Sequence, residues 1–157
     1  MAMRRLLLVL SVGLTLVAAP AADAALPRTL SADKDLVNLN RGRGVARFSG
    51  YGVLWGGFVR GRIRVTDLPG GAQTVVRVYG AEQVTYVNSV TRVYRGRYVR
   101  FNIHTGRWRA GITARGINAS AVLRGVMWLG GTAGTYTIEG SRPRPWPLDL
   151  TLFTLGG

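Results

Sequence analysis

The chain contains no cysteine and a single histidine, and both shortages exclude chemistry. Without cysteine there are no disulfides, no thiolate nucleophile and no cysteine-ligated metal. His104 has no second histidine with which to share a metal, and a histidine that acts as a general base needs a partner to orient it. We therefore interpret His104 as an ordinary surface residue, and we predict no cofactor, no metal and no catalytic site.

Acidic residues are scarce as well, with seven Asp and Glu against 21 Lys and Arg and a net charge of +14. Glycoside hydrolysis requires two paired carboxylates, but Asp67 falls in a predicted turn, and Glu82 and Glu139 fall at predicted strand ends. A carbohydrate-active enzyme is therefore a less favoured alternative to a protein without enzymatic activity. A chain this basic is expected to meet anionic partners, such as envelope polymers or lipid head groups.

The segment 1–24 has the pattern of a secretory signal peptide. Arg4 and Arg5 precede an apolar run over residues 6–19. Ala22 and Ala24 then provide the small side chains at positions −3 and −1 of a cleavage site after Ala24. The apolar run is too short to span a bilayer comfortably, so we predict no transmembrane helix after cleavage. We predict export to the periplasm, the cell surface or the medium, which argues against intracellular nucleic acid as a partner. Loss of Arg4, Arg5 and Asp23 would leave a net charge of +13 (14 − 2 + 1).

The rest of the sequence predicts one β-domain over residues 42–157, preceded by a lead-in over residues 25–41 that is a loop or a short helix. Val, Thr and aromatic residues alternate with polar ones at a period of two, as in strands. Alternate prolines at 142–147 remove backbone donors and predict an extended connector. Strands are expected at residues 45–49, 58–66, 74–79, 84–88, 117–129, 135–139 and 148–152. The predicted fold is a single antiparallel β-sandwich or small closed barrel of about seven to nine strands, with a short β-helix as the alternative.

The clearest local prediction is a hairpin around Thr105-Gly106, in which Ile103 faces Trp108. In that register the apolar side chains on one face are Val99, Phe101, Ile103, Trp108, Ala110 and Ile112. The polar ones on the other face are Tyr98, Arg100, Asn102, His104, Arg107, Arg109, Thr113 and Arg115. A slip of one residue would exchange the two faces. In the predicted strand 58–66, three arginines alternate in the same way with Val59, Gly61, Ile63 and Val65.

Arginine carries the one pattern with functional promise. Guanidinium groups bind phosphate and carboxylate in a bidentate manner, and tyrosine rings offer a stacking surface. The candidate anion-binding residues are Arg60, Arg62, Arg64, Tyr98, Arg100, Arg107, Arg109 and Arg115. They predict an exported, non-enzymatic module that associates with anionic cell-envelope or extracellular polymers. The competing interpretation is a solvated outer face that keeps the protein soluble and blunts edge pairing.

The four tryptophans are divided between core and surface. Trp108 points to the apolar face of the hairpin, and Trp55 and Trp128 are predicted to join it in the core. Trp146, framed by prolines, is expected to pack its ring on the domain, with an exposed platform for a sugar as the alternative.

A further pattern runs from Tyr94 to Gly140. The segment YRGRYVRFNIHTGRWRAGITARGINASAVLRG combines glycine-studded strands with a basic hairpin, and GTYTIEG follows as a closing strand. In these features the chain resembles a group of small exported β-proteins of high-GC bacteria that has no established activity. The resemblance implies an all-β exported domain and carries over no functional residue.

A second alternative for the function is a small outer-membrane β-barrel. Its apolar faces would meet lipid, and its arginines would fill a polar lumen. The segment 25–157 that remains after cleavage barely suffices for about eight strands of about ten residues each.

Overall fold

The computed structural model describes residues 33–157, so the predicted signal peptide and residues 25–32 of the predicted lead-in lie outside the described residues. The strands are β1 (Asp35–Leu68), β2 (Val75–Tyr86), β3 (Thr91–His104), β4 (Arg107–Ile138), β5 (Arg144–Pro145) and β6 (Thr151–Leu155). They form one antiparallel sheet in the order β2-β3-β1-β4-β5, with β6 also paired to β4. The predicted all-β class is confirmed. In the described part of the chain, no helix is long and apolar enough to cross a membrane.

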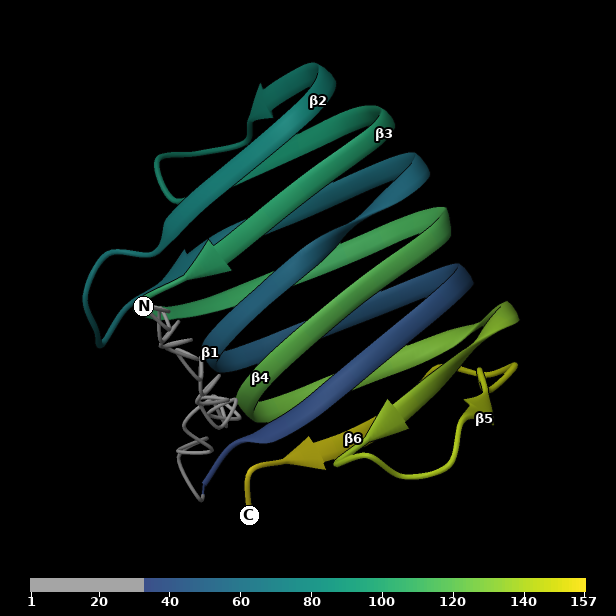
Figure 1. Ribbon diagram of the computed structural model, residues 1–157. Coiled ribbons are helices and arrows are strands. Elements are labelled where there is room, and N and C mark those ends of the chain that lie inside the picture. Colours follow the sequence, from purple (N-terminus) through teal and green to yellow (C-terminus); the bar gives the residue numbers. More distant parts are fainter. Residues whose placement is uncertain (1–32) are drawn as a thin grey trace, which may run out of the picture.

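The sheet winds on itself because β1 and β4 pair along both of their edges. Ala46 of β1 lies between Ile112 and Leu129 of β4. Trp108 of β4 lies between Gly50 and Asp67 of β1. The distance in sequence from Gly50 to Asp67 is the same as that from Ile112 to Leu129. The two strands therefore form an antiparallel ribbon that coils with a constant repeat, and each of these pairs is one turn apart. In Figure 1 each long strand crosses one layer, bends over and returns in a second layer.

An extra outward-facing residue marks the bends. Val59 and Arg60 of β1 are both exposed, although neighbours along a strand normally face opposite sides. Arg97 and Tyr98 of β3 are likewise both exposed, and the pairing of the two strands skips Val59 and Tyr98. Tyr98 also has a positive φ of 54°. Such bulge-like irregularities bend a strand locally and reset its alternation, so apolar side chains face inward again in the next layer.

Half a turn further along the ribbon, two glycines allow the backbones to approach closely. Gly50 of β1 lies opposite Gly125 of β4, and their φ angles are 155° and 152°. A Cβ atom on Gly125 would lie 2.2 Å from the carbonyl oxygen of Ser49. A Cβ atom on Gly50 would lie 2.1 Å from the carbonyl oxygen of Arg124. Only residues without a Cβ fit this crossing.

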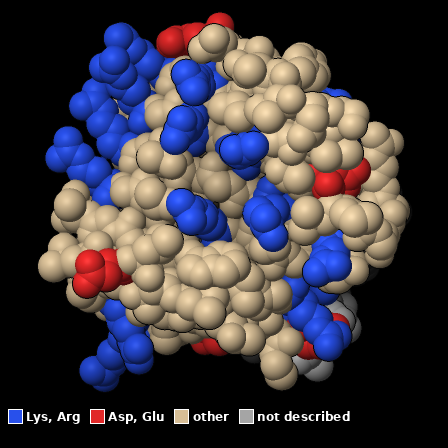
Figure 2. Space-filling model, turned by 180° about the vertical axis from the view of Figure 1, so that it is seen from behind, with Lys and Arg blue, Asp and Glu red and all other residues tan. Residues whose placement is uncertain are grey.

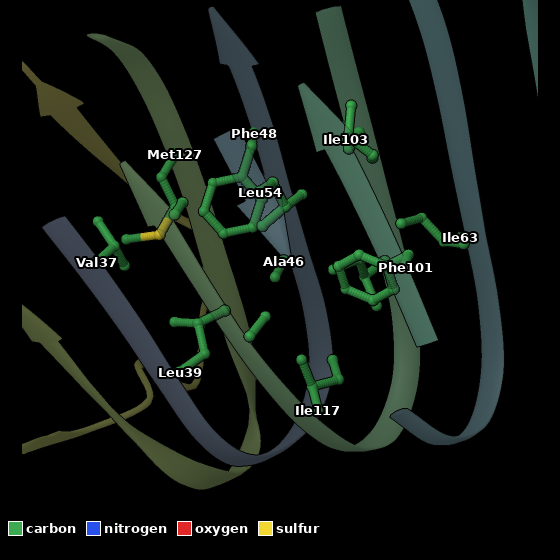
Figure 3. Close-up of a cluster of buried hydrophobic side chains, with 14 of the residues drawn as sticks. Val37, Leu39, Ala46, Phe48, Leu54, Ile63, Phe101, Ile103, Ile117 and Met127 are labelled. Atoms are coloured by element: carbon green, nitrogen blue, oxygen red, sulfur yellow. The ribbon is translucent and has the colours of Figure 1, made fainter. Parts of the chain in front are cut away.

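The hydrophobic core fills the space between the two layers. Figure 3 shows side chains from the long strands pointing toward one another, including Phe48, Leu54, Phe101 and Met127. Trp108 is fully buried, and its Nε1 donates a hydrogen bond to the carbonyl oxygen of Gly52 at 3.1 Å. The alternation that the sequence displays therefore turns one face of each strand into an apolar interior. The opposite face carries the arginines together with exposed apolar side chains such as Val53 and Trp55.

The C-terminal segment covers the last turn of the ribbon. β5 pairs with β4 at Thr135 and Tyr136, and β6 pairs with β4 from Gly125 to Leu129. Between them Trp146 is buried against Gly42, and its Nε1 donates to the carbonyl oxygen of Thr135 at 3.2 Å. The expected packing of Trp146 on the domain is confirmed.

The predicted sandwich or closed barrel of seven to nine strands is not confirmed, because the sheet formed by residues 33–157 has six strands and is not closed. Segments 45–49 and 58–66, predicted as two strands, are both parts of β1. Segments 117–129 and 135–139, with the glycine-rich stretch between them, belong to β4 except for residue 139. A β-helix, the predicted alternative, would also have a coiled path. In this structure, however, β4 lies between neighbouring turns of β1, and the two strands pair in antiparallel fashion.

The prediction of a hairpin around Thr105-Gly106 is wrong about which strands pair. It is correct about which side chains face the core. β3 and β4 both pair with β1, which lies between them in the sheet. Thr105 and Gly106 both have positive φ angles, as in a tight turn, but this turn leads from one layer into the other. The six apolar side chains assigned to one face are nevertheless all buried. Alternation along each strand determined the faces, whereas the pairing depended on β1.

Three other local predictions are corrected. β1 begins at Asp35, inside the segment that was expected to be a loop or short helix. Val59 is exposed because it lies at a bend. The last strand begins at Thr151, and Leu148, Leu150 and Leu152 are exposed, since the strand pairs with β4 at the edge of the sheet and buries only Leu155 fully.

The close crossing of Gly50 and Gly125 predicts a large loss of stability on substitution. We expect Gly125→Ala to lower the free energy of unfolding by about 2–5 kcal/mol, because it combines backbone strain with overpacking. Urea denaturation measures the change. The control is Gly71→Ala, where the nearest atom to a new Cβ is 3.5 Å away, and the expected change is below about 1 kcal/mol. Equal changes in the two variants would show that the crossing is not a constraint.

Candidate anion-binding face

One layer of the coil carries arginines on its outer surface. Inward positions are taken by the core, so alternate residues of β1, β3 and β4 face solvent there. The exposed arginines at outward-facing positions of this layer are Arg43, Arg47, Arg60, Arg62, Arg64, Arg95, Arg97, Arg109 and Arg115. Figure 2 shows this side of the molecule, with blue side chains gathered around a tan hollow.

Four of these arginines form a row across the strands, which we call the arginine ladder. Arg60 of β1 lies directly opposite Arg97 of β3 on one side and Arg115 of β4 on the other. Arg115 in turn lies opposite Arg43, in the preceding turn of β1. Neighbouring strands are about 4.8 Å apart, so the four positions span about 15 Å. Like charges directly opposite one another destabilise a sheet, so this row costs folding energy.

The other five arginines surround a hollow of about 1000 Å³, which we call the arginine groove. They are Arg47, Arg62, Arg64, Arg95 and Arg109. Between them the lining consists mainly of valine, threonine and tryptophan side chains: Val45, Thr66, Thr85, Val87, Thr91, Val93, Thr113 and Trp128. The groove therefore combines a cationic rim with a floor rich in methyl groups and one indole.

Gly111 explains why the surface is hollow at this point. It lies between Arg64 and Arg47 in the cross-strand row and has no side chain to fill the space between them. A Cβ atom there would find only the Cγ of Arg47, at 3.9 Å. On one side the row continues from Arg64 to Val93, and on the other from Arg47 to Trp128, so larger side chains flank the gap.

The groove has no acidic counterpart. No Asp or Glu lines it, and the one ion pair found within residues 33–157 joins Arg124 to Asp33 at 3.3 Å, outside the groove. A carboxylate, Glu82, lines a second, smaller hollow of about 250 Å³ together with Arg60, Arg95 and Arg97. Within the described residues, the positive potential of the groove is therefore left for anions outside the protein to neutralise.

The structure brings together some of the predicted site residues and separates the others. Arg62, Arg64 and Arg109 line the groove, and Arg60 and Arg115 belong to the ladder. The other three lie elsewhere: Tyr98 is exposed at a bend, Arg100 lies beyond that bend opposite Gly57 and Tyr79, and Arg107 lies over the ring of Tyr51 at 5.9 Å.

Four arginines of the face were missed in the sequence. Arg43 and Arg47 precede Arg60 and Arg64 by the same distance in sequence that separates Ile112 from Leu129. That spacing corresponds to one turn of the ribbon. A reader who knew the number of residues in a turn could therefore have placed Arg43 and Arg47 beside Arg60 and Arg64 from the sequence. Arg95 lies between the buried Tyr94 and Gly96, and Arg97 follows Gly96, but the place of both arginines beside β1 requires knowledge of the strand pairing.

The tryptophan predictions are partly wrong. Trp108 is in the core as expected. Trp55 is 39% exposed, and Trp128 is half-buried in the floor of the groove. Both occupy outward positions of their strands, and this follows from the alternation of Leu54 and Met127 into the core.

The residues considered for other chemistry have structural contacts. His104 Nδ1 lies 2.9 Å from the hydroxyl of Thr105. Asp67 accepts a hydrogen bond from the Thr74 hydroxyl at 2.6 Å, which closes the loop after β1, and Glu139 accepts one from the backbone N–H of Leu36. Among residues 33–157, no three His, Asp or Glu side chains come together as metal ligands.

Comparison with known proteins adds no relative. No family model matches the chain, and no similar curated protein or solved structure is found. The arginine ladder and the arginine groove are therefore the features of this protein from which a function can be inferred.

The repulsion within the ladder predicts that one arginine fewer stabilises the protein. We expect Arg60→Gln to raise the free energy of unfolding by about 0.5 kcal/mol at low salt, and to lose this gain in about 1 M NaCl, where the charges are screened. Arg77→Gln is the matched control, because Arg77 is exposed on a strand and lies opposite the uncharged Asn102. A gain that persists at high salt, or one equal in both variants, would show that the arginines do not repel one another.

Proposed function

We propose that this protein is an exported, non-enzymatic module that associates with anionic cell-envelope or extracellular polymers through the arginine-rich face. The observation that carries the proposal is that nine exposed arginines occupy outward-facing positions of one layer, with no carboxylate in the groove among the described residues. A surface that keeps a protein soluble gains nothing from placing like charges in direct register. Binding of an anion would remove the repulsion.

The ladder and the groove suit a polymer because they offer several sites in a row. A guanidinium group binds phosphate or carboxylate through two parallel hydrogen bonds. Where such groups repeat along a chain, each further contact is made intramolecularly, so weak contacts add up to firm retention. Polyanions also release counterions when they bind, which makes the affinity strongly dependent on salt.

The sequence-based alternatives gain no support from the positions of these side chains. An outer-membrane barrel with an arginine-filled lumen would carry its apolar side chains on the outside. In the described residues, the apolar cluster lies between the layers and the arginines face solvent. A carbohydrate-active enzyme would need a pair of carboxylates. Here the carboxylate of Asp67 accepts a hydrogen bond that closes a loop, and that of Glu139 accepts one from the start of β1.

The proposal predicts salt-dependent binding of a polyanion that depends on this face and not on net charge alone. The probe is a fluorescently labelled polyphosphate, titrated at several NaCl concentrations. We expect the variant with Arg62→Glu, Arg64→Glu and Arg109→Glu to bind at least about 100-fold more weakly than the wild type at low salt, since three contacts become repulsive.

The control carries the same change in charge elsewhere. It combines Arg77→Glu, Arg100→Glu and Arg142→Glu, which replace exposed arginines outside the groove. We expect this variant to bind within about tenfold of the wild type, since only the long-range potential is reduced. Equal losses in both variants, or no binding by the wild type, would refute a localised anion-binding face.

A further inference from the structure

The floor of the arginine groove has a different chemistry from its rim. The side chains of Val45, Val93 and Trp128 are half-buried at its base, and Thr66 and Thr113 add methyl groups. A polymer of phosphates or carboxylates needs only the guanidinium groups and water. A floor of this kind is unnecessary for such a ligand, and it leaves apolar surface exposed to solvent.

The hollow also has the size of a site for a single molecule. Ligand sites typically have volumes of about 300–1,000 Å³, with mainly apolar walls and a few polar groups that orient the ligand. The arginine groove, at about 1000 Å³, lies at the upper end of this range. Gly111 keeps its centre open, since a residue with a larger side chain there would fill the space between Arg47 and Arg64.

We propose that the arginine groove binds one anionic amphiphile, a phosphorylated lipid whose chain lies on the valine and tryptophan floor and whose phosphate meets the arginine rim. This inference rests on the proposed function, because it assigns a second class of ligand to the same face. Charge complementarity selects the occupant. A second copy of this chain would bring further arginines to a cluster that already lacks carboxylates, and a neutral lipid would leave the rim unpaired.

The physical reason for tight binding is that the two parts of the ligand act together. The chain removes apolar surface from water, and each buried methylene strengthens binding about three- to fourfold. The phosphate accepts paired hydrogen bonds from guanidinium groups that have no carboxylate partner in the described part of the groove. Neither inorganic phosphate nor a neutral amphiphile offers both.

The test compares dodecyl phosphate, inorganic phosphate and dodecyl maltoside by isothermal titration calorimetry, with the two amphiphiles kept below their critical micelle concentrations. We expect dodecyl phosphate to bind with one-to-one stoichiometry and at least about 100-fold more tightly than either of the others, given the gain for each buried methylene. Shortening the chain to octyl phosphate is expected to weaken binding. Equal affinity for dodecyl and inorganic phosphate would overturn the inference.

Two variants separate this inference from the proposed function. Gly111→Val fills the floor at a position with room for a Cβ and with β-branched chemistry that suits a strand. We expect it to lose at least about tenfold in affinity for dodecyl phosphate, as a few methylenes are displaced, and to retain polyphosphate binding, because the arginines of the rim and of the ladder are unchanged. Trp128→Ala removes part of the floor by another route, and the same pattern is expected.

The outcomes distinguish the two claims. Polyphosphate binding without preference for dodecyl phosphate overturns the amphiphile site and leaves the proposed function standing. If the wild type binds neither polyphosphate nor dodecyl phosphate, both the proposed function and the amphiphile site are overturned. A dimer in analytical ultracentrifugation that Trp128→Ala dissociates, together with no binding of dodecyl phosphate, would assign the floor to a second copy of the chain and overturn the inference.

Discussion

The pairing of β1 with β4 along both edges is the constraint on which the rest of the structure depends. Because each strand meets the other twice, with a constant offset along the chain, the ribbon must coil and its two layers must enclose a core. The coil in turn requires bends that bring backbones very close, as at Gly50 and Gly125. It also requires unbroken alternation between the bends, so that Phe48, Leu54 and Trp108 all reach the interior.

The same constraint produces the candidate binding face. Residues one turn apart in β1 come to lie on either side of a single stretch of β4, as Arg47 and Arg64 do around Gly111. The backbone hydrogen bonds of the sheet therefore hold together arginines that would otherwise move apart. Stability at this face is exchanged for a concentrated positive potential, which is the usual compromise at a binding surface.

The sequence predicted strand faces better than strand partners. Alternation over residues 99–112 assigned every apolar side chain correctly, because the side of a strand is a local property. It placed β3 against β4, because a tight turn such as Thr105-Gly106 normally closes a hairpin. The insertion of β1 between them depends on contacts far apart in the chain, which no local pattern records.

The candidate site was half predictable for the same reason. The arginine stripe of Arg60, Arg62 and Arg64 was identified from its alternation alone. Arg43 and Arg47 belong beside it only because the ribbon completes one turn between the two sets and returns β1 to the other edge of β4. The hollow itself depends on Gly111, whose missing side chain matters only once its neighbours across the strands are known.

The most direct test of the account is a map of polyanion contacts at the level of single arginines. Arginine Nε–Hε signals of the isotope-labelled protein, assigned by substitution, are followed by NMR as unlabelled polyphosphate is added. The account predicts that the signals of the ladder and the groove shift together and saturate together, while those of Arg77, Arg100 and Arg142 stay in place. Uniform small shifts over all arginines, or shifts confined to those three, would contradict it.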